Sequence, residues 1–72
     1  MNETEFNVAM LRGGYNAPKM AKALDMSYTW FRKKKSGGAL FDMEEIKTIS
    51  RLLDLDINQV NVIFFGGEIK YA

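Results

Sequence analysis

The chain has no cysteine and no histidine among its 72 residues. The lack of cysteine excludes a disulfide scaffold, and the lack of both residues removes the usual ligands of a zinc site, so we expect no metal and no cofactor. No apolar run approaches the ~20 residues that cross a bilayer, and no signal peptide opens the sequence. We therefore expect a soluble, cytoplasmic protein without a membrane partner.

Proline occurs once, at Pro18, and the six glycines form three adjacent pairs. Little therefore interrupts helix formation, whereas the glycine pairs are suited to ending helices. A hydrophobic fraction of 47% is too high for a disordered chain. A length of 72 residues allows one domain at most. We predict a single domain over residues 1–72.

Capping residues and apolar periodicity predict an all-α fold, a compact five-helix bundle without a strand. Asn2 with Glu5 fits a reciprocal side-chain cap, and Asp42 with Glu45 repeats that signature. The predicted helices span residues 3–12, 17–24, 28–35, 43–53 and 57–65. The last residues, 68–72, are expected either to fray or to add a short extended piece.

The core should form from one apolar face of each helix. The clearest amphipathic stripe belongs to the helix at 43–53 and consists of Met43, Ile46, Ile49, Leu52 and Leu53. Phe31 should lock the preceding helix onto this stripe. Phe64 and Phe65 are adjacent, so only one ring can point into the core. The other ring, within the segment 56–72, is a candidate for an interface with another chain.

Charge is distributed unevenly along the chain. Residues 12–35 contain seven basic residues and one acid, a charge of +6, and the remainder carries −5. Such asymmetry indicates an anionic partner for one face. Alternatively, the basic run at 32–35 is only a solvated helix end, where cations are stabilised by the partial negative charge of the helix C-terminus.

The helices at 17–24 and 28–35, joined by a short corner, predict a helix-turn-helix over residues 16–36 whose second helix enters the major groove. If Phe31 points into the core, Thr29 and Lys33 lie nearly opposite, and Trp30 and Arg32 lie on the flanks. The candidates for contact with base edges are Tyr28, Thr29, Arg32 and Lys33. The candidates for contact with phosphates are Asn16, Lys19, Lys22, Ser27, Lys34 and Lys35.

Aromatic residues on the same helix indicate a second use for this surface. Tyr and Trp are enriched at the energetic centres of protein interfaces, although a half-buried packing role is the alternative for Trp30. The candidates for a protein interface are Tyr28, Trp30, Arg32, Phe64 and Phe65.

Residues 16–65 resemble the Cro and phage-repressor group of helix-turn-helix proteins (XRE type), especially small regulators from temperate phages of Gram-positive bacteria. The matching stretches are 16–24, 26–27 with Phe31, 36–37, 41–46, 52–55 and 63–65. The resemblance implies a five-helix fold, an apolar dimer surface near the last helix, and operator binding at a lysis–lysogeny switch in the bacterial host. Some regulators of this size act instead as modulators that bind the repressor.

The chain departs from this family at positions that matter for base contacts. The family often has glycine where this chain has Asp25, in a turn that aspartate tolerates less well. Ala17, Pro18, Tyr28 and Thr29 occupy positions where the family often has glutamine, asparagine or arginine. Bidentate contacts with bases are therefore fewer than is usual for the family.

Two functions are consistent with these features. The first is a transcription regulator that acts on double-stranded operator DNA, alone as a homodimer or together with a partner phage repressor. The second is an antirepressor that docks its helix-turn-helix face on that repressor and alters its DNA binding. We expect neither catalysis nor a small-molecule substrate, because the chain lacks histidine and cysteine and the side chains of Glu44 and Glu45 diverge on one helix.

Overall fold

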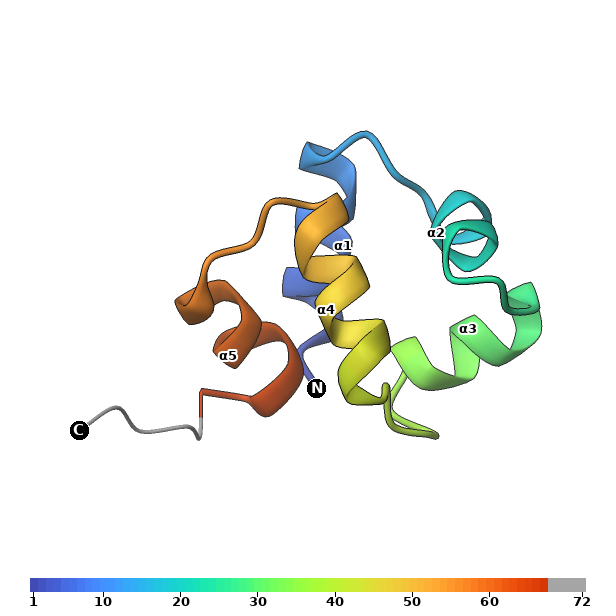
Figure 1. The fold of residues 1–72 in the computed structure, drawn as a ribbon. Helices are drawn as coiled ribbons and strands as arrows, with labels where there is room; N and C mark the ends of the chain where they lie inside the picture. The colour runs from blue at the N-terminus through green and yellow to red at the C-terminus, as the bar shows by residue number, and fades with distance from the viewer. Residues whose placement is uncertain (68–72) are drawn as a thin grey trace.

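The computed structural model describes residues 1–67, and this part of the chain forms five α-helices and no strand. They are α1 (Glu3–Arg12), α2 (Ala17–Ala23), α3 (Tyr28–Lys35), α4 (Met43–Leu52) and α5 (Ile57–Phe65). In Figure 1, α4 lies across the centre with α1 behind it, α5 lies on one side, and α2 and α3 lie together on the other. The predicted all-α class with five helices is confirmed. The expectation for 68–72 concerns residues outside the described part.

Each of these helices begins at a side chain that accepts a backbone N–H from the first turn. The five capping residues are Asn2, Asn16, Ser27, Asp42 and Asp56. The reciprocal box forms at α4 and also at α5, where Gln59 provides the returning side chain.

The reciprocal cap predicted at α1 is formed only in part. Asn2 Oδ1 accepts the N–H of Glu5 at 3.1 Å, as expected. The N–H of Asn2, however, donates to the carbonyl of Ile63 at 2.7 Å. The start of α1 is thus tied to α5, a tertiary bond that local sequence signals do not contain.

The corner between α2 and α3 is a closed, hydrogen-bonded turn. Leu24 is the C-cap of α2, and Asp25 adopts the left-handed conformation at φ 55°. The N–H of Asp25 donates to Lys22 at 3.0 Å and that of Met26 donates to Ala21 at 3.0 Å. This pair of bonds is the Schellman motif, which usually has glycine at the left-handed position.

The corner between α4 and α5 repeats this turn. Leu53 is the C-cap of α4, and Asp54 has φ 53°. The N–H of Leu55 donates to the carbonyl of Ser50 at 2.9 Å. The left-handed residue explains why both helices end one residue earlier than predicted, at 23 and 52. A residue at positive φ cannot continue the helix, so the preceding leucine becomes the cap.

Four phenylalanine rings join four parts of the chain. Phe6 of α1, Phe31 of α3, Phe41 of the loop before α4 and Phe64 of α5 have ring centroids 5.8–6.0 Å apart in five pairs. The rings are tilted or edge-on, which suits the quadrupoles of aromatic pairs. Phe6 and Phe31 are completely buried.

The core confirms part of the predicted stripe on α4. Ile46 and Ile49 are buried, and Leu52 and Leu53 pack against the core half-buried. Met43 was expected in the core and is 57% exposed. It is the first residue of α4, and because helical side chains lean toward the N-terminus, it projects past the end of the packed face.

Within residues 1–67 no helix combines the length and the apolar character that crossing a membrane would require.

Replacing Phe31 by alanine should lower the free energy of unfolding by about 3–5 kcal/mol, because the removed ring leaves a cavity beside the rings of Phe6 and Phe41. Urea unfolding followed by circular dichroism measures this change. Leu40→Ala is the control, because Leu40 is 88% exposed and its loss should change stability by less than about 0.5 kcal/mol. Equal midpoints for the parent and the Phe31 variant would contradict the packing described above.

Asp25→Gly and Asp54→Gly should each raise the free energy of unfolding by about 0.5–1 kcal/mol, because glycine adopts positive φ without the Cβ clash. The change also removes a negative charge from the end of a helix, where carbonyl groups concentrate partial negative charge. Lys22→Gly is the sign control: it places glycine inside α2 and should destabilise by about 1 kcal/mol. Thermal melts that show a loss at either aspartate position would refute the argument.

Candidate nucleic-acid interface

The α2–α3 pair forms one unit held by buried side chains. α2 buries Met20 and Ala21, and α3 buries Phe31, while the corner at 24–27 keeps the two helices side by side. Asn16 Oδ1 accepts from Lys19 N–H at 2.9 Å and Ser27 Oγ accepts from Trp30 N–H at 3.1 Å. Asn16 and Ser27, two of the predicted phosphate contacts, thus use their side-chain oxygens to cap α2 and α3. Both residues are exposed.

The exposed face of α3 carries three of the predicted base-contact residues. Thr29, Arg32 and Lys33 are exposed, and Phe31 is completely buried. The helical phase predicted from the sequence is confirmed by this burial. Tyr28, the fourth candidate, is 46% exposed at the first position of α3.

Exposed cations of this unit lie over aromatic rings. The guanidinium carbon of Arg32 is 5.6 Å from the ring centroid of Tyr28, and Lys33 Nζ is 5.4 Å from that of Trp30. On α2, Lys19 Nζ lies 5.0 Å from the ring centre of Tyr15 and donates to the Gly14 carbonyl at 3.3 Å. Cation–π contacts at exposed sites are weak, so these cations can exchange the ring for an anionic ligand.

Lys34 does not lie on this face, which corrects its prediction as a phosphate contact. Only 8% of the residue is exposed, and Nζ lies 2.6 Å from Glu45 Oε1 on α4. A position three residues after Phe31 lies on the same side of a helix, so the periodicity that placed Phe31 in the core also contained this signal. The run of four basic residues concealed it.

Lys35 is also directed inward. Its Nζ lies 2.9 Å from Glu3 Oε2 and 3.0 Å from Asn7 Oδ1, both on α1. Its side chain is 15% exposed. The run at 32–35 therefore divides into two outward cations, Arg32 and Lys33, and two that attach α3 to its neighbours.

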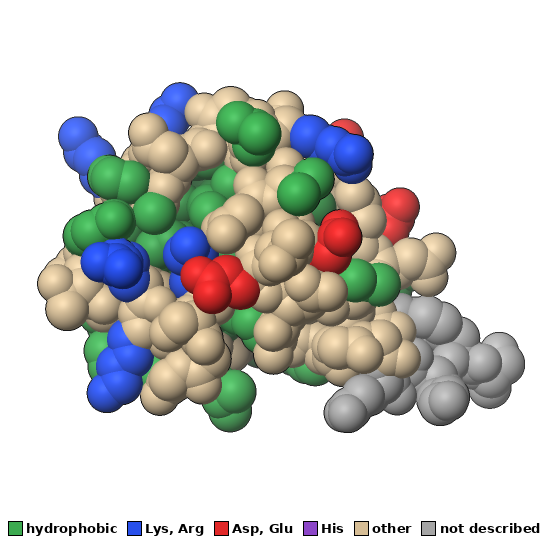
Figure 2. All heavy atoms as spheres, turned by 180° about the vertical axis from the view of Figure 1, so that it is seen from behind, with side chains coloured by type: hydrophobic (Ala, Val, Ile, Leu, Met, Phe, Trp, Pro, Cys, Tyr) green, Lys and Arg blue, Asp and Glu red, His purple; other side chains and the backbone are tan. Residues whose placement is uncertain are grey.

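Positive charge gathers on one end of the molecule. Figure 2 shows most of the visible lysine and arginine side chains on the side of α2 and α3, interspersed with hydrophobic groups. The exposed cations of these two helices are Lys19, Lys22, Arg32 and Lys33. Asp25, the one acid of the segment 12–35, is exposed in the corner between them.

The protein-interface candidates on α5, Phe64 and Phe65, are both half-buried but differ in their packing against the core. Phe64 packs in the aromatic cluster, so its ring is committed to the core. Phe65 is half-buried and lines a groove of about 280 Å³ with Met1, Leu40 and Ile46. As expected, only one of the two rings, that of Phe64, packs against the core cluster, although both rings line this groove. The predicted interface at Phe65 stays a prediction.

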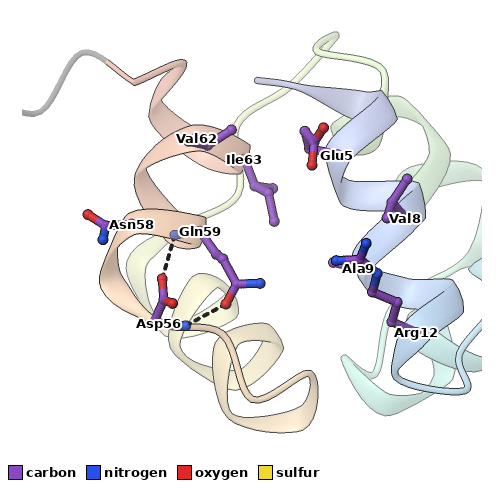
Figure 3. A pocket seen from close by; sticks show the side chains of 9 residues that line it. All are labelled: Glu5, Val8, Ala9, Arg12, Asp56, Asn58, Gln59, Val62 and Ile63. Carbon is purple, nitrogen blue, oxygen red and sulfur yellow. Dashed lines mark hydrogen bonds between the residues drawn. The ribbon is translucent and has the colours of Figure 1, made fainter.

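A second groove, of about 210 Å³, separates α1 from α5. Figure 3 shows Glu5 and Arg12 at opposite ends of α1 in this groove, with Val8 and Ala9 between them. On the α5 side, Asp56 and Gln59 bond each other's backbone as the capping box, at 2.8 and 2.9 Å. These polar groups are spread out or engaged in capping, and we assign no ligand to this groove.

Comparison with known proteins adds no family to these observations: no protein-family model matches the chain, and neither a curated protein nor a solved structure matches it significantly. The resemblance to Cro-type and phage-repressor proteins therefore stays a prediction.

Proposed function

We propose that this protein is a DNA-binding transcription regulator of the helix-turn-helix type, with α3 in the major groove. The observation that carries the proposal is the division of α3 into a buried anchor, Phe31, and an outward face with Thr29, Arg32 and Lys33. Arginine and lysine can bond guanine O6 and N7, and a threonine methyl can contact thymine.

The exposed charge supports double-stranded DNA as the ligand. Lys19 and Lys22 of α2 are exposed on the same α2–α3 unit as Arg32 and Lys33. Lysines at such positions can contact phosphates and so position the protein on the duplex. The start of α3 adds backbone N–H groups at a capped helix terminus, where anions are favoured. Lys34 and Lys35 are not part of the proposed contact set.

The resemblance noted in the sequence suggests the setting. We propose an operator at the lysis–lysogeny switch of a temperate phage, in the cytoplasm of the bacterial host, with the phage repressor or a second copy as partner. The proposed role is binding, without catalysis, a cofactor or a small-molecule substrate.

A second candidate function is supported by the aromatic residues of α3. Tyr28 is 46% exposed and Trp30 is 44% exposed, on the two flanks of the outward face. Large, rigid, half-exposed rings beside cations are typical of protein hot spots. In this alternative the protein is a modulator whose α2–α3 face docks on a repressor and changes that repressor's DNA binding.

The salt dependence of DNA binding tests the first function. Lys19→Gln and Lys22→Gln, at the exposed phosphate candidates of α2, should each reduce the slope of log affinity against log salt by about 0.9, the value for one neutralised phosphate. Lys35→Gln is the matched control, a lysine of the same basic segment whose ammonium pairs with Glu3 and Asn7, and its slope should equal that of the parent. Fluorescence anisotropy with a duplex of mixed sequence gives these slopes. A slope near zero for the unmodified protein would contradict DNA binding through this face.

Alanine substitutions of the aromatic residues separate the two functions. If the face docks on the phage's own repressor, Tyr28→Ala and Trp30→Ala should each cost about 2 kcal/mol or more of binding free energy, because truncated anchors leave unfilled pockets. If the face binds DNA, Arg32→Gln and Lys33→Gln should cost more than either aromatic substitution. Titrations of each variant against the repressor and against the duplex show which substitutions cost the most binding free energy, and so decide between the two functions. Tight binding to an operator that neither aromatic substitution affects would rule out the docking alternative as the main function.

A further inference from the structure

Lys34 is a buried cation that neither proposed function uses. Its Nζ lies 2.6 Å from Glu45 Oε1, 5.6 Å from the ring centre of Trp30 and 5.8 Å from that of Phe41. The side chains of Lys34 and Glu45 are 9% and 18% exposed. A charge so poorly solvated persists only with a partner, so the pair must form as the domain folds.

The carboxylate of Glu45 exceeds what helix capping requires. Glu45 Oε1 accepts the N–H of Asp42 at 2.9 Å and completes the capping box of α4. The equivalent box of α5 is completed by an amide, Gln59, which accepts the N–H of Asp56 at the same distance, 2.9 Å. Since an amide suffices at α5, the negative charge at α4 is accounted for by Lys34.

The pair joins the outward face of α3 to the start of α4. Trp30 precedes Lys34 by four residues, so the lysine stem and the indole share one side of the helix. Lys33 Nζ lies 5.4 Å from the same ring centre. The half-exposed indole therefore lies beside two ammonium groups, and of these two only that of Lys34 is paired with a carboxylate, the half-buried one of Glu45, among the described ion pairs.

We infer that Lys34 is a positioning residue: held by Glu45, its ammonium fixes the orientation of the Trp30 indole at the edge of the α3 contact surface. The consequence for ligand binding rests on the proposed function of α3, whereas the orientation of the indole does not. Lys34 and Glu45 would thus act on the contact surface through Trp30, without touching DNA or a repressor themselves.

The test uses Trp30 as its own reporter, because it is the one tryptophan of the chain. The variant combines Lys34→Met, which retains a long apolar side chain, with Glu45→Gln, which retains the capping acceptor. It removes one charge of each sign, so the net charge of the protein is unchanged and no unpaired buried charge remains. Time-resolved fluorescence anisotropy is measured without any ligand, at a temperature where circular dichroism shows each variant to be folded.

In this variant the sub-nanosecond depolarisation of Trp30 should increase in amplitude by about two-fold, because the indole loses a contact that restrains it. The matched control combines Lys47→Met with Glu44→Gln, which removes an exposed pair on α4 with atoms 3.7 Å apart. This control should leave the depolarisation unchanged. Lys34→Arg, which keeps a cation beside Glu45, should restore most of the parental anisotropy and guards against a variant that fails to fold.

Binding to the mixed-sequence duplex gives the second readout. The double variant should bind about five-fold more weakly, equivalent to the loss of one ordered contact. Its slope of log affinity against log salt should equal that of the parent. A slope reduced by about 0.9 would show that Lys34 holds a phosphate, and would overturn the inference. Unchanged Trp30 anisotropy would overturn it as well, whatever the binding data. Failure of the unmodified protein to bind the duplex would count against the proposed function alone, because the anisotropy is measured without DNA.

Discussion

The cluster of four phenylalanine rings is the contact on which the rest of this structure depends. It joins α1 and α5, near opposite ends of the described chain, to α3 and the loop before α4. Because a domain of this size buries a modest fraction of its surface, each large ring contributes a substantial share of the stability. Phe31 also gives α3 its rotation, since burying that ring determines which of its neighbours face outward.

Two further contacts complete the placement of α3. Lys34 pairs with Glu45 on one flank, and Lys35 pairs with Glu3 and Asn7 on the other. The helix is thus attached to α4 and to α1 by side chains from the same basic run that supplies its outward cations. A charged segment that appears uniform in sequence therefore directs one half of its cations outward and uses the other half to attach α3 to its neighbours.

The division of the basic run changes the composition of the outward face of α3. With only Arg32 and Lys33 directed outward, the face has less charge than its sequence suggests, and the half-exposed rings of Tyr28 and Trp30 form a larger share of it. DNA binding and docking on a repressor would draw on the same residues in different proportion. Under the two proposed functions, DNA and a repressor would therefore compete for this surface.

The sequence by itself determined the helices and their starting points, because a cap such as Ser27 or Asp56 acts on N–H groups within one turn of its own position. It also predicted the rotation of α3, because a Phe31 that points into the core places Thr29 and Lys33 on the opposite side of the helix. Even the corner at Asp25 could be located, although a residue with positive φ shifts the helix end by one position.

Only the tertiary structure decided the partners of long side chains and of the chain end. The N–H of Asn2 bonds Ile63 and not the side chain of Glu5, and the Nζ of Lys35 reaches α1, because elements distant in sequence happen to pack beside them. Met43 is exposed because the packed face ends before it. Local signals extend over about one helical turn, whereas a lysine stem spans the gap between helices. Its partner therefore depends on which helix lies next to it in space.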